Sequence, residues 1–119
     1  MGQEIVTEYG VITINKDVIA TLAGIAATSC FGIVGMVSSR MISDGISDLL
    51  GKEALSKGVD VTIQGDHLII RVSIVVGYGN NISIIANNVV EKIKYTVETH
   101  TGLIVDRVDV RIQGVRVID

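Results

Sequence analysis

The sequence predicts one α+β domain over residues 1–119, a two-layer sandwich with helices on one face of a four-stranded, mainly antiparallel sheet. Its length of 119 residues suits a single domain. Valine and isoleucine supply 37 of those residues, whereas the chain holds three Tyr, one Phe and no Trp or Pro. Segments that alternate apolar and polar residues, as strands do, lie between segments that repeat with the period of helices.

The first half of the chain reads as a strand, two helices and a strand. A β-prone run at 10–14 leads into a helix that Asn15 or Asp17 can cap and that we expect to end at Gly32. A weaker helical period follows across 37–50, and the polar segment 51–58 is expected to form a surface loop or a short helical turn. The first helix carries an apolar face and, beside it, small residues that allow close packing: Val18, Ile19, Leu22, Ile25 and Ala26, with Ala20, Ala23, Gly24 and Ala27.

The second half reads as two strands, a helix and a strand. Alternation predicts strands at 59–64 and 67–76, joined by a tight turn at Gly65-Asp66. A helix that Asn80, Asn81 or Ser83 can start then runs to about His100, with a glycine stop at Gly102, and a last strand covers 105–112. One face of strand 67–76 is wholly aliphatic: Leu68, Ile70, Val72, Ile74 and Val76.

A seven-residue segment occurs twice, because VDVTIQG at 59–65 returns as VDVRIQG at 108–114, where Gly114 can mark a β-bulge. Each copy ends a strand–helix–strand unit, so we interpret the chain as two related halves with the order β-α-(α)-β-β-α-β. This is the ferredoxin-like split βαβ arrangement. The order of elements in 10–64, around a GIVG segment, is also that of a KH domain, so a KH-like order is the alternative.

Composition argues against several classes of function. The net charge of −3 makes binding to DNA or RNA unexpected, because such affinity depends on Lys and Arg neutralising phosphates. Four aromatic residues are too few for a nucleic-acid stacking platform. The uncharged run 18–39 is long enough to span a membrane, but it is rich in small residues and interrupted by Gly32 and Gly35. We therefore expect a packed helix and a glycine turn there.

We find no constellation of catalytic residues and expect no enzyme activity, cofactor or metal site. His67 and His100 stand alone, without Cys, His or carboxylate residues at ligand spacing. Gly77-Tyr78-Gly79 lacks the third glycine of a dinucleotide-binding loop. Cys30 is expected to be a buried, inert thiol, which fits a reducing, cytoplasmic compartment, and the N-terminus shows no secretory signal.

Two surfaces are candidates for function. The sheet face away from the helices mixes charged and apolar side chains and suits self-association or a protein partner: Ile69, Arg71, Ser73, Val75, Asp109, Arg111 and Gln113. The second is the apolar glycine turn of Gly32, Ile33, Val34, Gly35 and Met36. A KH domain would use such a turn to clamp RNA, but the absence of nearby basic residues favours a close-packing role. A small-ligand or acyl-chain cleft between helices 18–31 and 82–100 is a third hypothesis.

Six segments also carry a family resemblance: YGVITINKDVIATLAGIAA (9–27), GIVGM (32–36), GISDLL (45–50), KGVDVTIQG (57–65), IVVGYGNNI (74–82) and VDRVDVRIQGVRV (105–117). They resemble the alkaline shock protein family, the Gls-type envelope stress response proteins of Gram-positive bacteria. The short chain is similar to the small YloU-like branch, which lacks the charged tails of larger members.

The resemblance implies a cytoplasmic, non-enzymatic protein associated with the cell envelope and with alkaline or cell-wall stress. It also implies a scaffold or adaptor that forms homo-oligomers and binds a protein partner near the membrane. Some family members are held there by a small integral membrane anchor protein, although the short branch need not share that anchor. The family has no agreed catalytic residues, so none are transferred to this chain.

Overall fold

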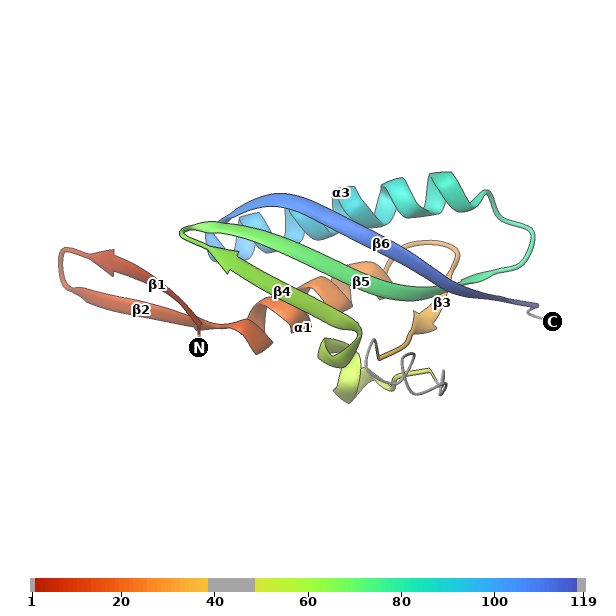
Figure 1. Ribbon diagram of the computed structural model, residues 1–119, viewed down its shortest axis with the longest axis horizontal. Helices are drawn as coiled ribbons and strands as arrows, with labels where there is room; N and C mark the ends of the chain where they lie inside the picture. The colour runs from red at the N-terminus through yellow and green to blue at the C-terminus, as the bar shows by residue number, and fades with distance from the viewer. Residues whose placement is uncertain (1, 39–48, 118–119) are drawn as a thin grey trace.

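The computed structural model describes residues 2–38 and 49–117, which form a two-layer body and a separate hairpin (Figure 1). The helical stretch predicted across 37–50 lies mostly outside these residues. At its two ends, Val37 and Leu49 form an isolated antiparallel bridge. In chain order the elements are β1 (Gly2–Thr7), β2 (Gly10–Asn15), α1 (Lys16–Thr28), β3 (Ile33–Met36), the 3-10 helix η1 (Lys52–Gly58), β4 (Val59–Gln64), β5 (His67–Gly77), α3 (Ile82–Thr101) and β6 (Ile104–Arg116).

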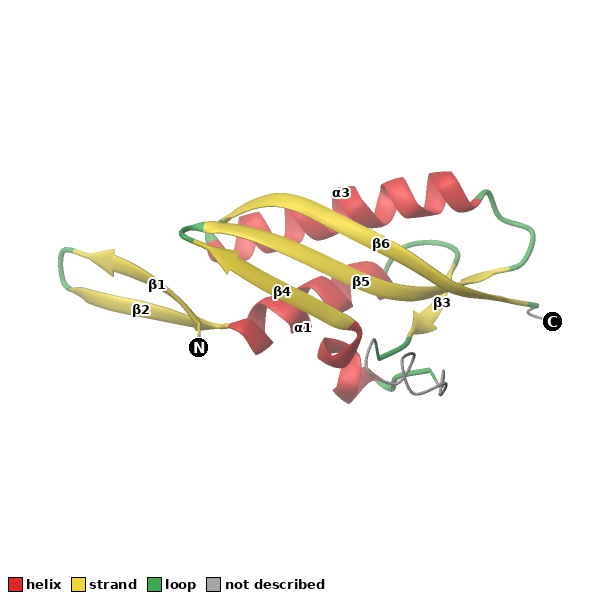
Figure 2. Ribbon diagram, in the orientation of Figure 1, coloured by secondary structure: helices red, strands yellow, loops and turns green. Residues whose placement is uncertain are grey.

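The central strand of the main sheet is β5, which pairs with the other three strands of that sheet. On one edge, β4 pairs antiparallel with the first part of β5, and β3 pairs antiparallel with its end. On the other edge, β6 runs parallel to β5 over its whole length. Both α1 and α3 lie behind this sheet in Figure 2. The predicted mixed α+β class, with a four-stranded, mainly antiparallel sheet and helices on one face, is therefore confirmed.

One predicted strand lies elsewhere. The run 10–14 falls in β2, which pairs antiparallel with β1 from Gly2 opposite Asn15 to Thr7 opposite Gly10. These two strands form a sheet of their own, and β3 takes the fourth place in the main sheet. Because β3, β4 and β6 already occupy both edges of β5, no edge of that strand is left for β2. The first half of the chain is therefore not a βαβ unit of the main sheet, and that part of the two-halves interpretation is wrong.

The core lies between β5 and the two helices, as alternation and helical periodicity predict. The predicted aliphatic face of β5 is fully buried. In α3, the side chain of Asn81 accepts a hydrogen bond from the Ile84 amide and caps the helix, and Gly102 ends it in the left-handed conformation. The residues of α3 that complete the core follow an i, i+4 spacing: Ile85, Val89, Ile93 and Val97.

The helix α1 ends at Thr28, four residues before the predicted stop at Gly32. The Thr28 hydroxyl donates to the Gly24 carbonyl at 2.9 Å, and the Ser29 hydroxyl donates to the Ala26 carbonyl at 2.8 Å. These hydroxyls satisfy carbonyls of the last turn and let the chain leave the helix. Among the described residues, no helix is both long and apolar enough to cross a membrane.

The buried face of α1 combines Ile19 and Ala26 of the predicted apolar face with the small residues beside it. A Cβ on Gly24 would lie 2.9 Å from the Cβ of Leu55 in η1, so the backbones approach closely at this point. Only the small-residue side permits that approach. As a result Val18 and Ile25 face outward, with 49% and 52% of their surface exposed.

The turn at Gly32 depends on glycine for two reasons. The first is its φ of +88°, which lies in the left-handed region, in a turn held by a hydrogen bond from the Gly77 amide to the Gly32 carbonyl at 2.9 Å. A Cβ at this position would also lie 2.6 Å from Cδ1 of Ile85. Gly102 has a similar φ of +75°, but a Cβ there would meet no atom within 4 Å.

We expect Gly32→Ala to lower the free energy of unfolding by about 2–4 kcal/mol, because conformational strain and crowding of Ile85 act together. Gly102→Ala is the matched control and should lose only the conformational part, about 1–2 kcal/mol. Adding Ile85→Val removes the crowded Cδ1 and should recover part of the Gly32→Ala loss in a double-mutant cycle measured by urea unfolding. Equal losses at the two glycines, without coupling to Ile85, would contradict the packing described here.

Candidate interaction surfaces

Arg71 lies in the middle of the open sheet face, between two aspartates of the repeated segment. Asp60 on β4 and Asp109 on β6 are both register partners of Arg71 on β5. Each aspartate is the second residue of its VDVxIQG copy. The repeat therefore places equivalent residues on opposite edges of the central strand, in an acid–base–acid row that suits cross-strand pairing.

Ion pairs extend this row along β6. Nε of Arg71 lies 3.4 Å from Oδ2 of Asp109, and Nε of Arg107 donates to Oδ1 of Asp109 at 2.7 Å. The hydrogen bond from Arg107 is the main cause of a lowered pKa for Asp109, and the same bond raises the pKa of Arg107. Exposed pairs of this kind add little stability. Their consequence is a fixed charge pattern on the open face.

The structure places the predicted open-face residues unequally. Arg71, Arg111 and Gln113 are exposed, and Ile69 and Asp109 are half-buried. In contrast, Ser73 and Val75 are only 3% and 4% exposed, although they belong to the same face. Gly35 and Gly114 are the neighbours of Val75 on the adjoining strands, and the Leu49 side chain packs where a Gly35 side chain would lie. The accessible part of the face is therefore the half around Arg71.

The bulge predicted at Gly114 is confirmed. Ile112 pairs with Ile74 and Gly114 pairs with Val75, which leaves Gln113 as the extra residue of β6. The bulge adds a residue to β6 without breaking its pairing with β5. Gln113, the extra residue, lies exposed at the rim of the open face.

The glycine turn is a half-buried packing element that ends in the buried Met36. Ile33–Met36 forms β3, in which Val34 is the extra residue of an irregular pairing with β5, and Met36 is fully buried. The GIVG backbone is thus committed to the sheet, whereas a KH domain needs it as an open loop between two helices. This pairing favours the close-packing interpretation of the segment over a KH-type loop.

The two helices leave the predicted ligand cleft filled by their own side chains. Ala23 and Ala27 of α1 and Val89 and Ile93 of α3 are fully buried in the common core.

Beyond the end of α1, the half-buried Cys30 thiol donates to the Ala26 carbonyl, and burial raises its pKa. A thiol of this kind is poorly reactive. In place of the predicted cleft between the helices, an open apolar hollow lies on the outer side of α1, lined by Asp17, Val18, Thr21 and Leu22.

The sequence analysis does not anticipate the arm, the hairpin formed by β1 and β2. The arm projects beyond the end of the main sheet (Figure 1), in a molecule that measures 54 × 29 × 21 Å. Ile5 and Ile14 pack against the core at its base, but four larger side chains of the arm are more than half exposed: Val6, Tyr9, Val11 and Ile12. The available signal is the β-branched run at 5–7 and the two-residue turn before Gly10.

Aromatic side chains also lie on the outside of this protein. Its three tyrosines and one phenylalanine are between 68% and 94% exposed: Tyr9, Phe31, Tyr78 and Tyr95. The core is built from aliphatic residues alone. Exposed aromatic residues are the side chains that most often dominate the energy of protein–protein contacts. The distribution therefore favours binding to other proteins.

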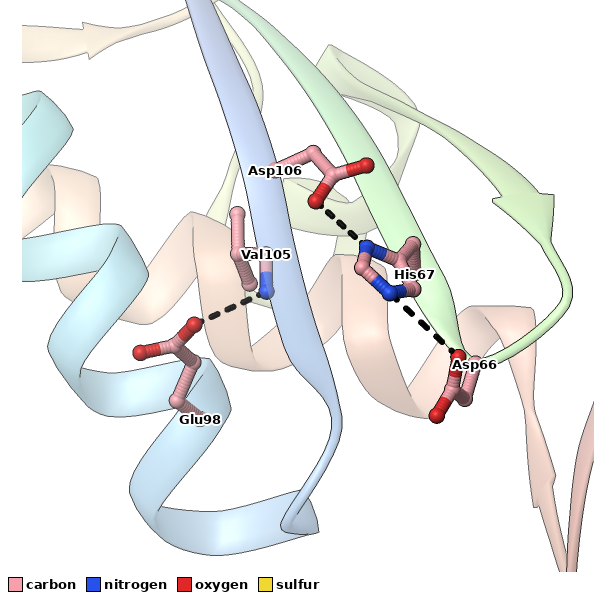
Figure 3. Close-up of polar contacts among 5 residues, drawn as sticks. All are labelled: Asp66, His67, Glu98, Val105 and Asp106. Atoms are coloured by element: carbon pink, nitrogen blue, oxygen red, sulfur yellow. Dashed lines mark hydrogen bonds and ion pairs between the residues drawn. The ribbon is translucent and has the colours of Figure 1, made fainter.

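A polar cluster joins the start of β5 to the start of β6 (Figure 3). Nδ1 of His67 donates to Asp106 at 2.6 Å, and its Nε2 lies 3.5 Å from Asp66. On the other side of β6, the Val105 amide donates to Glu98 of α3 at 2.9 Å. The hydrogen bond to Asp106 is the main cause of a raised pKa for His67. Across the described residues, no three His, Cys, Asp or Glu side chains are placed to hold a metal ion.

We expect the contribution of His67 to stability to depend on pH. Because folding raises the pKa of this histidine, its stabilising effect is complete below the unfolded value of about 6.5 and is lost as the pH rises through the folded value. His67→Gln should therefore lower the melting temperature more at about pH 5.5 than at about pH 8.5. Thermal unfolding of both proteins at both pH values tests this, and an equal loss at each pH would contradict it.

The chain matches the family model of the alkaline shock protein 23 family, described by a cell envelope-related function, over residues 4–117. The chain belongs to this family. It is 49% identical over 117 residues to YloU of Bacillus subtilis (strain 168), covering 98% of each chain. It is 39% identical over 118 residues to Spy1614 of Streptococcus pyogenes serotype M6, covering 99% of this chain and 98% of that protein.

A more distant family relative and a solved structure are also similar to this chain. YqhY of Bacillus subtilis (strain 168) is 32% identical over 110 residues, which cover 92% of this chain and 80% of YqhY. Among solved structures, the copper form of the MamM CTD D249H variant has a TM-score of 0.48 and 12% identity, covering 85% of this chain and 95% of that one. The relatives at this similarity confirm the family resemblance seen in the sequence.

Proposed function

We propose that the protein is a non-enzymatic scaffold or adaptor of the cell envelope. In this proposal it resides in the cytoplasm, self-associates and binds a protein partner at the inner face of the membrane. The observation that carries the proposal is the outward placement of the apolar arm and of every aromatic side chain, in a chain whose family is described by a cell envelope-related function. The partner that we propose is a small integral membrane protein.

The arrangement of the exposed surfaces supports a scaffold with two binding sides. The open sheet face carries the Arg71–Asp109–Arg107 charge network. The outer side of α1 carries Val18 and Ile25 and lies on the opposite side of the sandwich, because α1 covers the other face of the sheet. One side is charged and the other is apolar. Two partners of different chemistry can therefore bind at the same time, one copy of the chain and one membrane protein.

We expect the double reversal Arg71→Glu/Arg111→Glu to remove the membrane partner, because it turns two basic positions of the open face acidic. In affinity isolation from solubilised membranes of the native host, recovery of the partner should fall at least tenfold. The matched control is Lys57→Glu/Lys94→Glu, which makes the same charge change at exposed residues outside the open face.

The milder variant Arg71→Gln/Arg111→Gln covers the case in which two added glutamates beside Asp60 and Asp109 disturb folding. It should also lose the partner, with an unchanged circular dichroism spectrum. Recovery of the same membrane proteins by wild type and all variants would overturn the role of this face. Recovery of no membrane protein by the wild type would overturn the partner part of the proposal.

A further inference from the structure

We propose that a second copy of this chain covers the arm, in a two-fold dimer in which the arm of each protomer lies along α1 of the other. This inference rests on the self-association proposed above and names the surfaces that carry it. One contact surface of this dimer is the arm. The other is the α1 stripe, which we define as Val18, Leu22 and Ile25.

The arm lacks the cover that a hairpin needs. A two-stranded hairpin alone is marginally stable in water. Paired residues of an antiparallel ladder share a face, so Val6 with Val11 and Ile5 with Ile12 make the two faces of the arm apolar. The protein body covers only the base of the arm, through Ile5 and Ile14. A contact along one face of the arm would bury Val6 and Val11, whereas Ile12 lies on the opposite face beside Ile5.

The α1 stripe offers an apolar surface of matching length. The arm has six residues in each strand, about 20 Å, and α1 has 13 residues, also about 20 Å. The stripe consists of Val18 and Ile25, which the packing of α1 turns outward, and of Leu22, which is half-buried between them and the core. The hollow lined by Asp17, Val18, Thr21 and Leu22 lies on it. A strand pair laid along α1 would fill that hollow.

The direction of the two elements favours a second copy as the occupant. The arm and α1 meet at Asn15 and Lys16 and extend from there in opposite directions (Figure 1). A two-fold axis through this junction lays each arm on the α1 stripe of the partner in one operation. Such a contact is isologous and closes at two subunits. The dimer is held by two contacts of one hairpin on one helix each, so we expect it to dissociate on dilution.

Charge complementarity supports the same direction. Residues 2–15 contain Glu4 and Glu8 and no Lys or Arg. In the two-fold arrangement the tip of the arm, with Glu8, reaches the C-terminal end of the partner's α1. Lys92 of α3 is exposed at this end, next to Cys30, whose thiol it influences. The acidic tip therefore meets a basic side chain, which favours this orientation over the reverse.

Sedimentation velocity of the full chain over a range of concentrations tests the proposal. We expect a monomer–dimer equilibrium that Ile25→Glu and Val11→Glu each weaken at least tenfold, because either change buries a carboxylate in an apolar contact. The matched control Val115→Glu makes the same kind of change at a residue that is 49% exposed at the far end of the molecule, and should leave the equilibrium unchanged. Circular dichroism identifies variants that do not fold.

A cross-linking experiment distinguishes the geometry. In a Cys30→Ser background, Tyr9→Cys combined with Ile25→Cys should give covalent dimers with a short bis-maleimide and no ladder of larger products. A ladder would show head-to-tail assembly and overturn the two-fold dimer, as would cross-linked monomer alone.

The outcomes separate the two proposals. Association that Ile25→Glu and Val11→Glu leave intact would overturn the arm contact while self-association stands. A monomer at every concentration would overturn both.

Discussion

The pairing of β5 on both of its edges is the constraint on which the rest of this structure depends. One face of this strand forms the floor of the core, and its backbone bonds to β4, β3 and β6. Because both edges of β5 are used, the N-terminal strands do not pair with it, and they pair with each other instead. The projecting arm is thus separate from the main sheet.

A second consequence follows from how tightly the helix layer packs. The contact between Gly24 and Leu55 brings α1 and η1 together on the small side of the helix. Val18 and Ile25 of α1 are left on the surface, whereas Ile19 is fully buried. Apolar side chains are therefore exposed on both sides of the polar residues 15–17, on the arm and on α1. In the function proposed above, these exposed side chains bind other proteins.

Sequence reasoning located most elements because their signals are local. Alternation placed β4 at 59–64, and Asn81 and Gly102 marked the ends of α3 through hydrogen bonds that each residue makes with its own helix. Alternation also placed Arg71 and Asp109 on the open face. The same signal cannot say which edge a strand joins, since a run such as 10–14 alternates in the same way in any sheet. Pairing of β2 with β1 was decided by strands far away in the chain.

The missed features of the candidate surfaces have a similar origin. The two sides of α1 are both apolar, so periodicity alone selects the side with the larger residues, while the long-range contact with Leu55 selects the other. Burial of Val75 likewise depends on Leu49, which lies 26 residues earlier in the chain and packs over Gly35. Residue type predicted the elements well, but which side of each element remained exposed was set by packing between distant segments.

Hydrogen–deuterium exchange of the full chain at low and high protein concentration shows whether the arm becomes covered on association. We expect amides in β1 and β2 to exchange rapidly in dilute solution and to gain protection as concentration rises, while amides of β5 stay protected throughout. Exchange from the arm that is equally fast at every concentration, in a sample whose mass shows association, would contradict the claim that the arm is the self-association element.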